Sequence, residues 1–293
     1  MVDDATSGET GTAPPLPPGR HVELPGRGTT FIREVPGPPG APTVVLLHGW
    51  TATADLNWFT SFEALGRRFR VIAPDHRGHG RGIATSAPFK LRDCADDVVA
   101  LADELGIEQI IPVGYSMGGP VAQLIWHRHP ERVTGLVLCA TAKRFSSSRD
   151  ERLMFASMGA LARASRLTPS SLRDRLSSVY LARRAREYDA WAMEQVSRHD
   201  WTKILEAGRA IGRFSSGVWV VKIDIPVAVI VTMRDHVVPL RRQIELFEAI
   251  PGAKAYRIDG DHDACVVNAE RFVPTLVSAC THVAEQARVA AAG

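Results

Sequence analysis

Residues 110–129 read IIPVGYSMGGPVAQLIWHRH, and this stretch decides the fold. The apolar run 110–113 predicts a buried strand, and the helical period over 121–129 predicts a helix. Between them, Gly114 and Gly118 lie two residues before and two after Ser116, a spacing that permits a sharp strand-to-helix turn. Such a turn exposes the Ser116 hydroxyl beside a helix N-terminus. We therefore expect Ser116 to be a nucleophile, the alternative being a glycine-rich turn with a capping serine.

The rest of the chain alternates apolar runs with stretches of helical period. The expected helices cover 91–105, 239–250 and 267–288. Most of the runs from residue 43 onward are continuously apolar, which is typical of strands buried on both faces of a parallel sheet. The pattern predicts an α/β protein whose strands lie at 30–35, 43–47, 70–74, 110–114, 133–140, 226–231 and 253–258.

Residues 141–216 interrupt this alternation. They show no strand pattern but four helical ones, at 153–162, 172–180, 188–196 and 201–211, with Asp200 as a cap for the last. We expect an all-helical cap, whose apolar residues would cover the sheet edge that carries Ser116. The segment holds 15 Lys and Arg against 8 Asp and Glu. This surplus indicates a solvated helix face or attraction to anionic substrates or a membrane surface.

Composition bounds the remaining possibilities. The 293 residues are 45% hydrophobic and carry a net charge of +3, too small to indicate nucleic-acid binding. Residues 1–20 are polar and rich in proline and glycine, so we expect a disordered tail. The four scattered cysteines predict free, buried thiols. Without a visible signal peptide or an apolar run of about 18 residues, we expect a cytoplasmic protein with no integral membrane segment.

A serine nucleophile needs a base, and the base needs an acid that orients it. His262 follows the last apolar run and Asp235 follows the one before it, so both belong to loops at the carboxyl edge of the sheet. The order Ser116, Asp235, His262 is the one expected for this type of turn. His236 stays open as an alternative base, and Asp261 or Asp263 as an alternative acid.

Together with these residues, three further motifs resemble the α/β-hydrolase superfamily over residues 21–290. They are His48-Gly49-Trp50, the stretch DHRGHG at 75–80 and the stretch PERV at 130–133. The resemblance implies a mostly parallel eight-stranded core formed by residues 21–140 and 217–293, with the 141–216 cap between strands 6 and 7. It implies that Ser116, His262 and Asp235 are nucleophile, base and orienting acid, and that the amides of Trp50 and Met117 form an oxyanion hole.

The expected activity is hydrolysis of a carboxylic ester, lactone or thioester of a small hydrophobic molecule through an acyl-enzyme. Alternatives on the same residues are carbon–carbon bond hydrolysis, acyl transfer, cofactor-free perhydrolysis and a receptor-like binding module. Epoxide hydrolysis is disfavoured because those relatives carry aspartate where this chain has Ser116. We expect no cofactor, no metal and no nucleic-acid partner, and the sequence leaves the oligomeric state open. The residues expected to line the substrate pocket are Tyr115, Met154, Met158, Trp191 and Val237.

Overall fold

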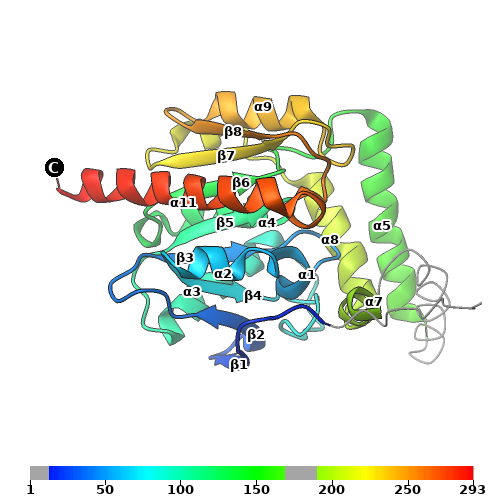
Figure 1. Ribbon diagram of the computed structural model, residues 1–293. Coiled ribbons are helices and arrows are strands. Elements are labelled where there is room, and N and C mark those ends of the chain that lie inside the picture. Colours follow the sequence, from blue (N-terminus) through cyan, green and yellow to red (C-terminus); the bar gives the residue numbers. More distant parts are fainter. Residues whose placement is uncertain (1–12, 169–189, 293) are drawn as a thin grey trace, which may run out of the picture.

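The computed structural model describes residues 13–168 and 190–292 and has an eight-stranded sheet at its centre (Figure 1). The strands lie side by side in the order β1-β2-β4-β3-β5-β6-β7-β8. They are β1 (Gly19–Leu24), β2 (Gly28–Val35), β3 (Thr43–Leu47), β4 (Arg70–Pro74), β5 (Ile111–Tyr115), β6 (Leu136–Cys139), β7 (Val227–Thr232) and β8 (Lys254–Ile258).

In this order the strands from β4 to β8 are parallel, and only β2 is reversed, so that it runs antiparallel to both β1 and β4. All residues of β3, β5, β6 and β7 are buried. Their continuous apolar sequences reflect this, because helices cover both faces of the sheet. The α/β class and the mostly parallel sheet predicted from the sequence are confirmed.

Helices pack on the sheet from both sides and bury two apolar clusters. One face carries α3 (Leu91–Glu104), α4 (Gly118–Arg128) and α9 (Leu240–Ala249). The other carries α1 (Ala54–Trp58), α2 (Phe62–Gly66), α10 (Ala264–Val267) and α11 (Ala269–Ala292). The short helices α1 and α2 are not predicted by the sequence, since five residues are too few to show a helical period. No helix in the described part of the chain has the length and apolar character needed to cross a membrane.

The first strand begins earlier than expected. β1 starts at Gly19, two residues inside the segment expected to be a disordered tail, and the Arg33 guanidinium donates to the carbonyl of Pro17 at 2.8 Å. Only Val22 and Leu24 of β1 are buried. A half-exposed edge strand of this kind lacks the apolar run that marks the central strands. The first twelve residues of the expected tail lie outside the described residues.

Between β6 and β7 the chain forms the helices α5 (Arg149–Leu167), α7 (Ala190–Ser197) and α8 (Trp201–Arg213). Their positions confirm three of the four helical patterns, and the pattern at 172–180 lies outside the described residues. Asp200 caps α8 as expected, because its Oδ1 accepts from the amides of Thr202 and Lys203. An isolated bridge between Arg144 and Ser215 joins the two ends of this insertion.

His199 ties the insertion to the core. Its Nδ1 accepts from the Gly80 amide at 2.9 Å, so its Nε2–H donates to the Thr51 carbonyl at 3.0 Å. Its ring lies 5.5 Å from that of His79. Burial, with nearby His48, lowers the pKa of His199 to about 4, although the Thr51 hydrogen bond and Asp75 act in the opposite direction. The folded protein therefore holds this imidazole neutral at pH values where the unfolded chain protonates it.

We expect His199 to make the protein less stable as the pH falls from about 6.5 towards 4. The unfolded chain binds more protons over this range, so this group lowers the free energy of unfolding by about 2 kcal/mol at pH 5 relative to pH 7.5. Urea unfolding at the two pH values should show a smaller loss for His199→Gln than for the unchanged protein. His21→Gln, at an exposed position of β1, should keep the full loss; an equal loss in the His199 variant contradicts the assignment.

Candidate active site

The turn from β5 into α4 places Ser116 in a left-handed conformation, with φ of 50°. Its amide donates to the Cys139 carbonyl of β6 at 2.9 Å. Its own carbonyl accepts from the Gly119 amide at 3.0 Å and the Thr141 hydroxyl at 2.7 Å. A positive φ is costly for a residue with a side chain, so these bonds are needed to hold it.

The glycines around Ser116 are required by close contacts with neighbouring backbone and with the Thr141 side chain. A Cβ at Gly114 would lie 2.3 Å from the carbonyl oxygen of Gly118, and one at Gly118 would lie 2.1 Å from that of Leu47. A Cβ at Gly119 would lie 2.2 Å from the Thr141 hydroxyl. Strand, turn and helix can therefore pack together only when these positions lack side chains.

Ser116, His262 and Asp235 meet in one hydrogen-bonded chain. His262 Nε2 lies 2.9 Å from Ser116 Oγ, and His262 Nδ1 lies 2.8 Å from Asp235 Oδ2. Asp235 is buried, whereas the His262 side chain is 20% exposed. The three residues come from turns that follow β5, β7 and β8, so the carboxyl edge of the sheet collects them.

Asp235 is held by donors from its own loop and from α9. Its Oδ1 accepts from the amides of Val237 and Val238, at 2.9 and 2.6 Å. Its Oδ2 accepts from the Thr232 hydroxyl at 2.7 Å and from the Gln243 side-chain amide at 3.1 Å. Thr232 and Gln243 are partners of Asp235 that the sequence does not predict. No local signal marks Gln243, because its contact depends on how α9 packs against the end of β7.

The alternative base and acids lie apart from this chain of contacts. His236 has a side chain that is 82% exposed, and its Nδ1 lies 2.7 Å from Asp261 Oδ2. Asp261 also accepts from the backbone amides of His236 and His262, and these hydrogen bonds lower its pKa to about 2. Asp263 precedes α10 as its N-cap residue. Asp235 is thus the carboxylate bonded to the His262 ring.

The loop after β3 lies against Ser116. A Cβ at Gly49 would lie 3.4 Å from the Ser116 Cβ, and the Gly49 amide donates to Asn57 Oδ1 at 2.8 Å. In the described part of the chain, the amides of Trp50 and Met117 donate no hydrogen bond. Among the described residues, these two amides thus have no protein acceptor.

The buried His48 ring holds this loop through two hydrogen bonds. Its Nδ1–H donates to the Gly49 carbonyl at 2.8 Å, and its Nε2 accepts from the His76 amide at 2.9 Å. Burial lowers the pKa of His48 and keeps it neutral. Asp75 accepts from the Ala54 and Arg81 amides, so the 75–80 turn is held in the same way. His48 and Asp75 thus hold the two turns through contacts with the backbone.

The indole of Trp50 reaches the inserted helices. Its Nε1–H donates to the Ile204 carbonyl of α8 at 2.9 Å. A Cβ at Gly208 would lie 2.7 Å from Trp50 Cζ2 and 2.4 Å from Met158 Sδ of α5. Met158 and Trp50 therefore meet at Gly208, so one expected pocket residue lies beside the loop next to Ser116.

The sequence predicts Tyr115 as a residue of the substrate pocket, but its side chain lies elsewhere. Its side chain is buried on the far face of the sheet, with ring centroids 6.0 Å from Trp58 and 5.7 Å from Phe272. Neighbouring side chains of a strand point to opposite faces, which directs Tyr115 into the core. Its hydroxyl instead donates to the His262 carbonyl at 2.7 Å. The buried Tyr115 side chain thus holds the loop that carries His262 through this hydrogen bond.

The other expected pocket residues are scattered. Trp191 of α7 is buried, with its ring 5.4 Å from Phe59. Met154 and Val237 are 49% and 65% exposed. On α5, Leu153 and Leu161 are exposed like Met154, so these apolar side chains are not buried by the described part of the chain. Across the described ranges, no group of three or more His, Cys, Asp or Glu side chains could hold a metal ion.

The model of the alpha/beta hydrolase fold family matches residues 42–269, and the chain belongs to this family. An enol-lactonase from Burkholderia xenovorans has a similar solved structure, with a TM-score of 0.70 and 25% identity over 89% of this chain and all of that one. The four buried cysteines are free thiols, as expected.

Two curated relatives match shorter regions. Epoxide hydrolase B of Mycobacterium tuberculosis is 36% identical over 122 residues, which is 40% of this chain and 34% of that protein. The bifunctional esterase/perhydrolase of Acinetobacter calcoaceticus is 36% identical over 95 residues, which is 32% of this chain and 34% of that protein. The matched region thus spans about a third of the length of each relative.

Replacement of Tyr115 by phenylalanine removes only the hydroxyl that donates to the His262 carbonyl. We expect Tyr115→Phe to lower the free energy of unfolding by about 1 kcal/mol, because the carbonyl loses its partner while the ring packing stays. Urea unfolding measures the change. Tyr256→Phe on β8 serves as the matched control. A Tyr115 variant as stable as the unchanged protein would show that this hydrogen bond does not hold the loop.

Proposed function

We propose that the protein is a serine hydrolase that cleaves a carboxylic ester, or a related lactone or thioester, of a small hydrophobic molecule. The observation that carries this proposal is the continuous contact from Ser116 Oγ through the His262 ring to Asp235. A serine hydroxyl becomes an effective nucleophile when a neutral imidazole accepts its proton and a carboxylate orients that imidazole.

In the first step Ser116 Oγ attacks the ester carbonyl and passes its proton to His262 Nε2. The negative charge that develops on the carbonyl oxygen is stabilised by the amides of Trp50 and Met117, and each such donor contributes about 3 kcal/mol to lowering the barrier. The carbon–oxygen bond to the alcohol then breaks, and His262 gives its proton to the departing oxygen. The acyl group stays on Ser116.

In the second step a water molecule attacks the acyl-enzyme and passes a proton to His262. The bond to Ser116 Oγ breaks, the proton returns to that oxygen, and the carboxylic acid leaves. Asp235 accepts from His262 Nδ1–H throughout and keeps the ring oriented. The apolar surroundings formed by Trp50 and Met158 support a hydrophobic acyl or alcohol group.

Perhydrolysis is the second candidate, and the resemblance to the esterase/perhydrolase favours it. Hydrogen peroxide would then replace water in the second step and release a peracid. Epoxide opening is not favoured by the match to epoxide hydrolase B, because Ser116 stands where an aspartate is expected for that chemistry. Product analysis of ester turnover with and without peroxide separates the two candidates.

Substitution of the nucleophile tests the proposal directly. We expect Ser116→Ala to lower kcat for p-nitrophenyl esters by about four to six orders of magnitude without loss of folding. A fluorophosphonate probe should label Ser116 in the unchanged protein, as located by mass spectrometry. Ser278→Ala on α11 is the control. Near-full ester hydrolysis by the Ser116 variant, or a label on another residue, would refute the proposal.

Gly208→Ala tests the role of Trp50 from a distance. The added methyl would lie 2.7 Å from the indole and push it away from α8. Because Trp50 carries one of the two proposed amide donors, we expect kcat/KM to fall by about 10²-fold while the far-UV circular dichroism is unchanged. Gly217→Ala is the matched control, since the nearest atom to its Cβ is 4.0 Å away. Full activity in a folded Gly208 variant would count against the Trp50 donor.

A further inference from the structure

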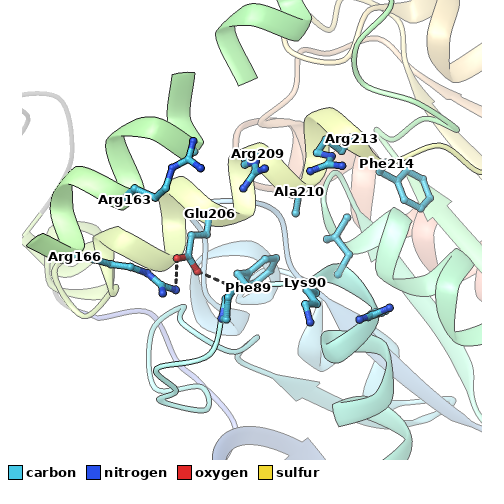
Figure 2. Close-up of a pocket in the computed structure, with 14 residues that line it drawn as sticks. Phe89, Lys90, Arg163, Arg166, Glu206, Arg209, Ala210, Arg213 and Phe214 are labelled. Atoms are coloured by element: carbon cyan, nitrogen blue, oxygen red, sulfur yellow. Dashed lines mark hydrogen bonds and ion pairs between the residues drawn. The ribbon is translucent and has the colours of Figure 1, made fainter. Parts of the chain in front are cut away.

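A cavity of about 750 Å³ lies beside α8 (Figure 2). Its walls come from α5, from α8 and from residues 88–92, which precede and begin α3. Along α8, the residues that line it are Glu206, Arg209, Ala210 and Arg213, whereas Gly208 faces Trp50. Ser116, Asp235 and His262 do not line this cavity, so it is distinct from the candidate active site.

The lining of the cavity is strongly basic. Glu206 is its one carboxylate, and that carboxylate is already neutralised: it lies 2.5 Å from Arg166 and 3.3 Å from Lys203, and it accepts from the Phe89 amide at 2.8 Å. The basic residues that line the cavity are Lys90, Arg92, Arg163, Arg166, Arg209 and Arg213.

Four of these arginines form two pairs whose spacing along the helix lowers the stability of that helix. Arg209 and Arg213 are four residues apart on α8, and Arg163 and Arg166 are three apart on α5. Like charges at these spacings repel each other. Within the described residues, Arg163, Arg209 and Arg213 have no carboxylate partner. A bound anion would relieve this repulsion.

Arg209 is held in place before any ligand binds. A Cβ at Gly159 of α5 would lie 2.3 Å from Arg209 Cδ, so the arginine stem crosses α5 where that helix has no side chain. The residue is half-buried. A guanidinium fixed in this way loses less conformational freedom on binding than one on an open surface.

The cavity also has apolar walls. Phe89, Leu91 and Ala162 are buried there, and Phe214 closes one end. The size of the cavity suits a small molecule, and the mixture of arginines with aromatic rings suits an anionic group attached to an apolar one. The planar guanidinium matches the oxygens of a phosphate in particular, which it can bind through two hydrogen bonds.

We propose that this cavity binds an organic phosphate, with the phosphate at Arg163, Arg209 and Arg213 and an apolar ring against Phe89 and Phe214. A second cavity of about 570 Å³ shares Arg209 and Arg213 and adds Arg144 and Arg152, which extends the positive field towards the same place. The proposal does not depend on the ester chemistry of Ser116.

Isothermal titration calorimetry with 1-naphthyl phosphate tests the site. We expect saturable binding by the unchanged protein that weakens with added salt, and no detectable binding of 1-naphthol. Arg209→Gln and Arg213→Gln should each raise Kd at least about tenfold. Gly159→Ala should raise it similarly, because the added methyl displaces Arg209 without removing its charge. Arg241→Gln, on the exposed face of α9, removes the same charge elsewhere and should leave Kd within about twofold.

Three outcomes would overturn the proposal. The first is no heat of binding with naphthyl phosphate at millimolar concentration. The second is an equal loss of affinity in the Arg209 and Arg241 variants, which would show attraction to net charge alone. The third is co-sedimentation with vesicles of phosphatidylglycerol, unchanged in Arg209→Gln, in a protein that does not bind naphthyl phosphate; this would indicate a basic surface for membranes instead of a small-molecule site.

Discussion

The left-handed turn at Ser116 is the constraint on which the site depends. A side chain at positive φ is tolerated here because the turn is bonded to β6 and Thr141. Gly114 and Gly118 also let the backbones of β3, β5 and α4 come into contact. The turn places the hydroxyl at the carboxyl edge of the sheet. The parallel strands β7 and β8 end at the same edge, so the loops that follow them bring Asp235 and His262 to Ser116.

The sequence predicts the central sheet well because those strands are buried on both faces and leave continuous apolar runs. Strands β3 and β4 have the predicted boundaries, and β7 begins and ends one residue later than predicted. The sequence does not predict the edge strand β1, because only two of its side chains are buried. The sequence does not predict the short helix α1 either, because its five residues make little more than one turn and show no helical period. Local pattern therefore predicts the elements whose burial is uniform or periodic over many residues.

The candidate site divides in the same way. Ser116 is predictable because the glycine spacing is a local requirement of the turn, and His262 and Asp235 because each directly follows a predicted strand. The support of Asp235 by Gln243 depends on how α9 packs against the end of β7, which no local pattern encodes. The error at Tyr115 has a simple origin: adjacency in sequence to Ser116 means the opposite face of the sheet.

Helices α5 and α8 meet along a line of glycines, and at each of them a Cβ would crowd a neighbouring side chain. Gly159 faces Arg209, Gly208 faces Trp50 and Met158, and Gly212 lies where a Cβ would be 2.2 Å from Phe155. Side chains of each helix thus fill the space opposite the glycines of the other. A redesign of this helix pair would therefore keep the three glycines and place new side chains at exposed positions such as Met154.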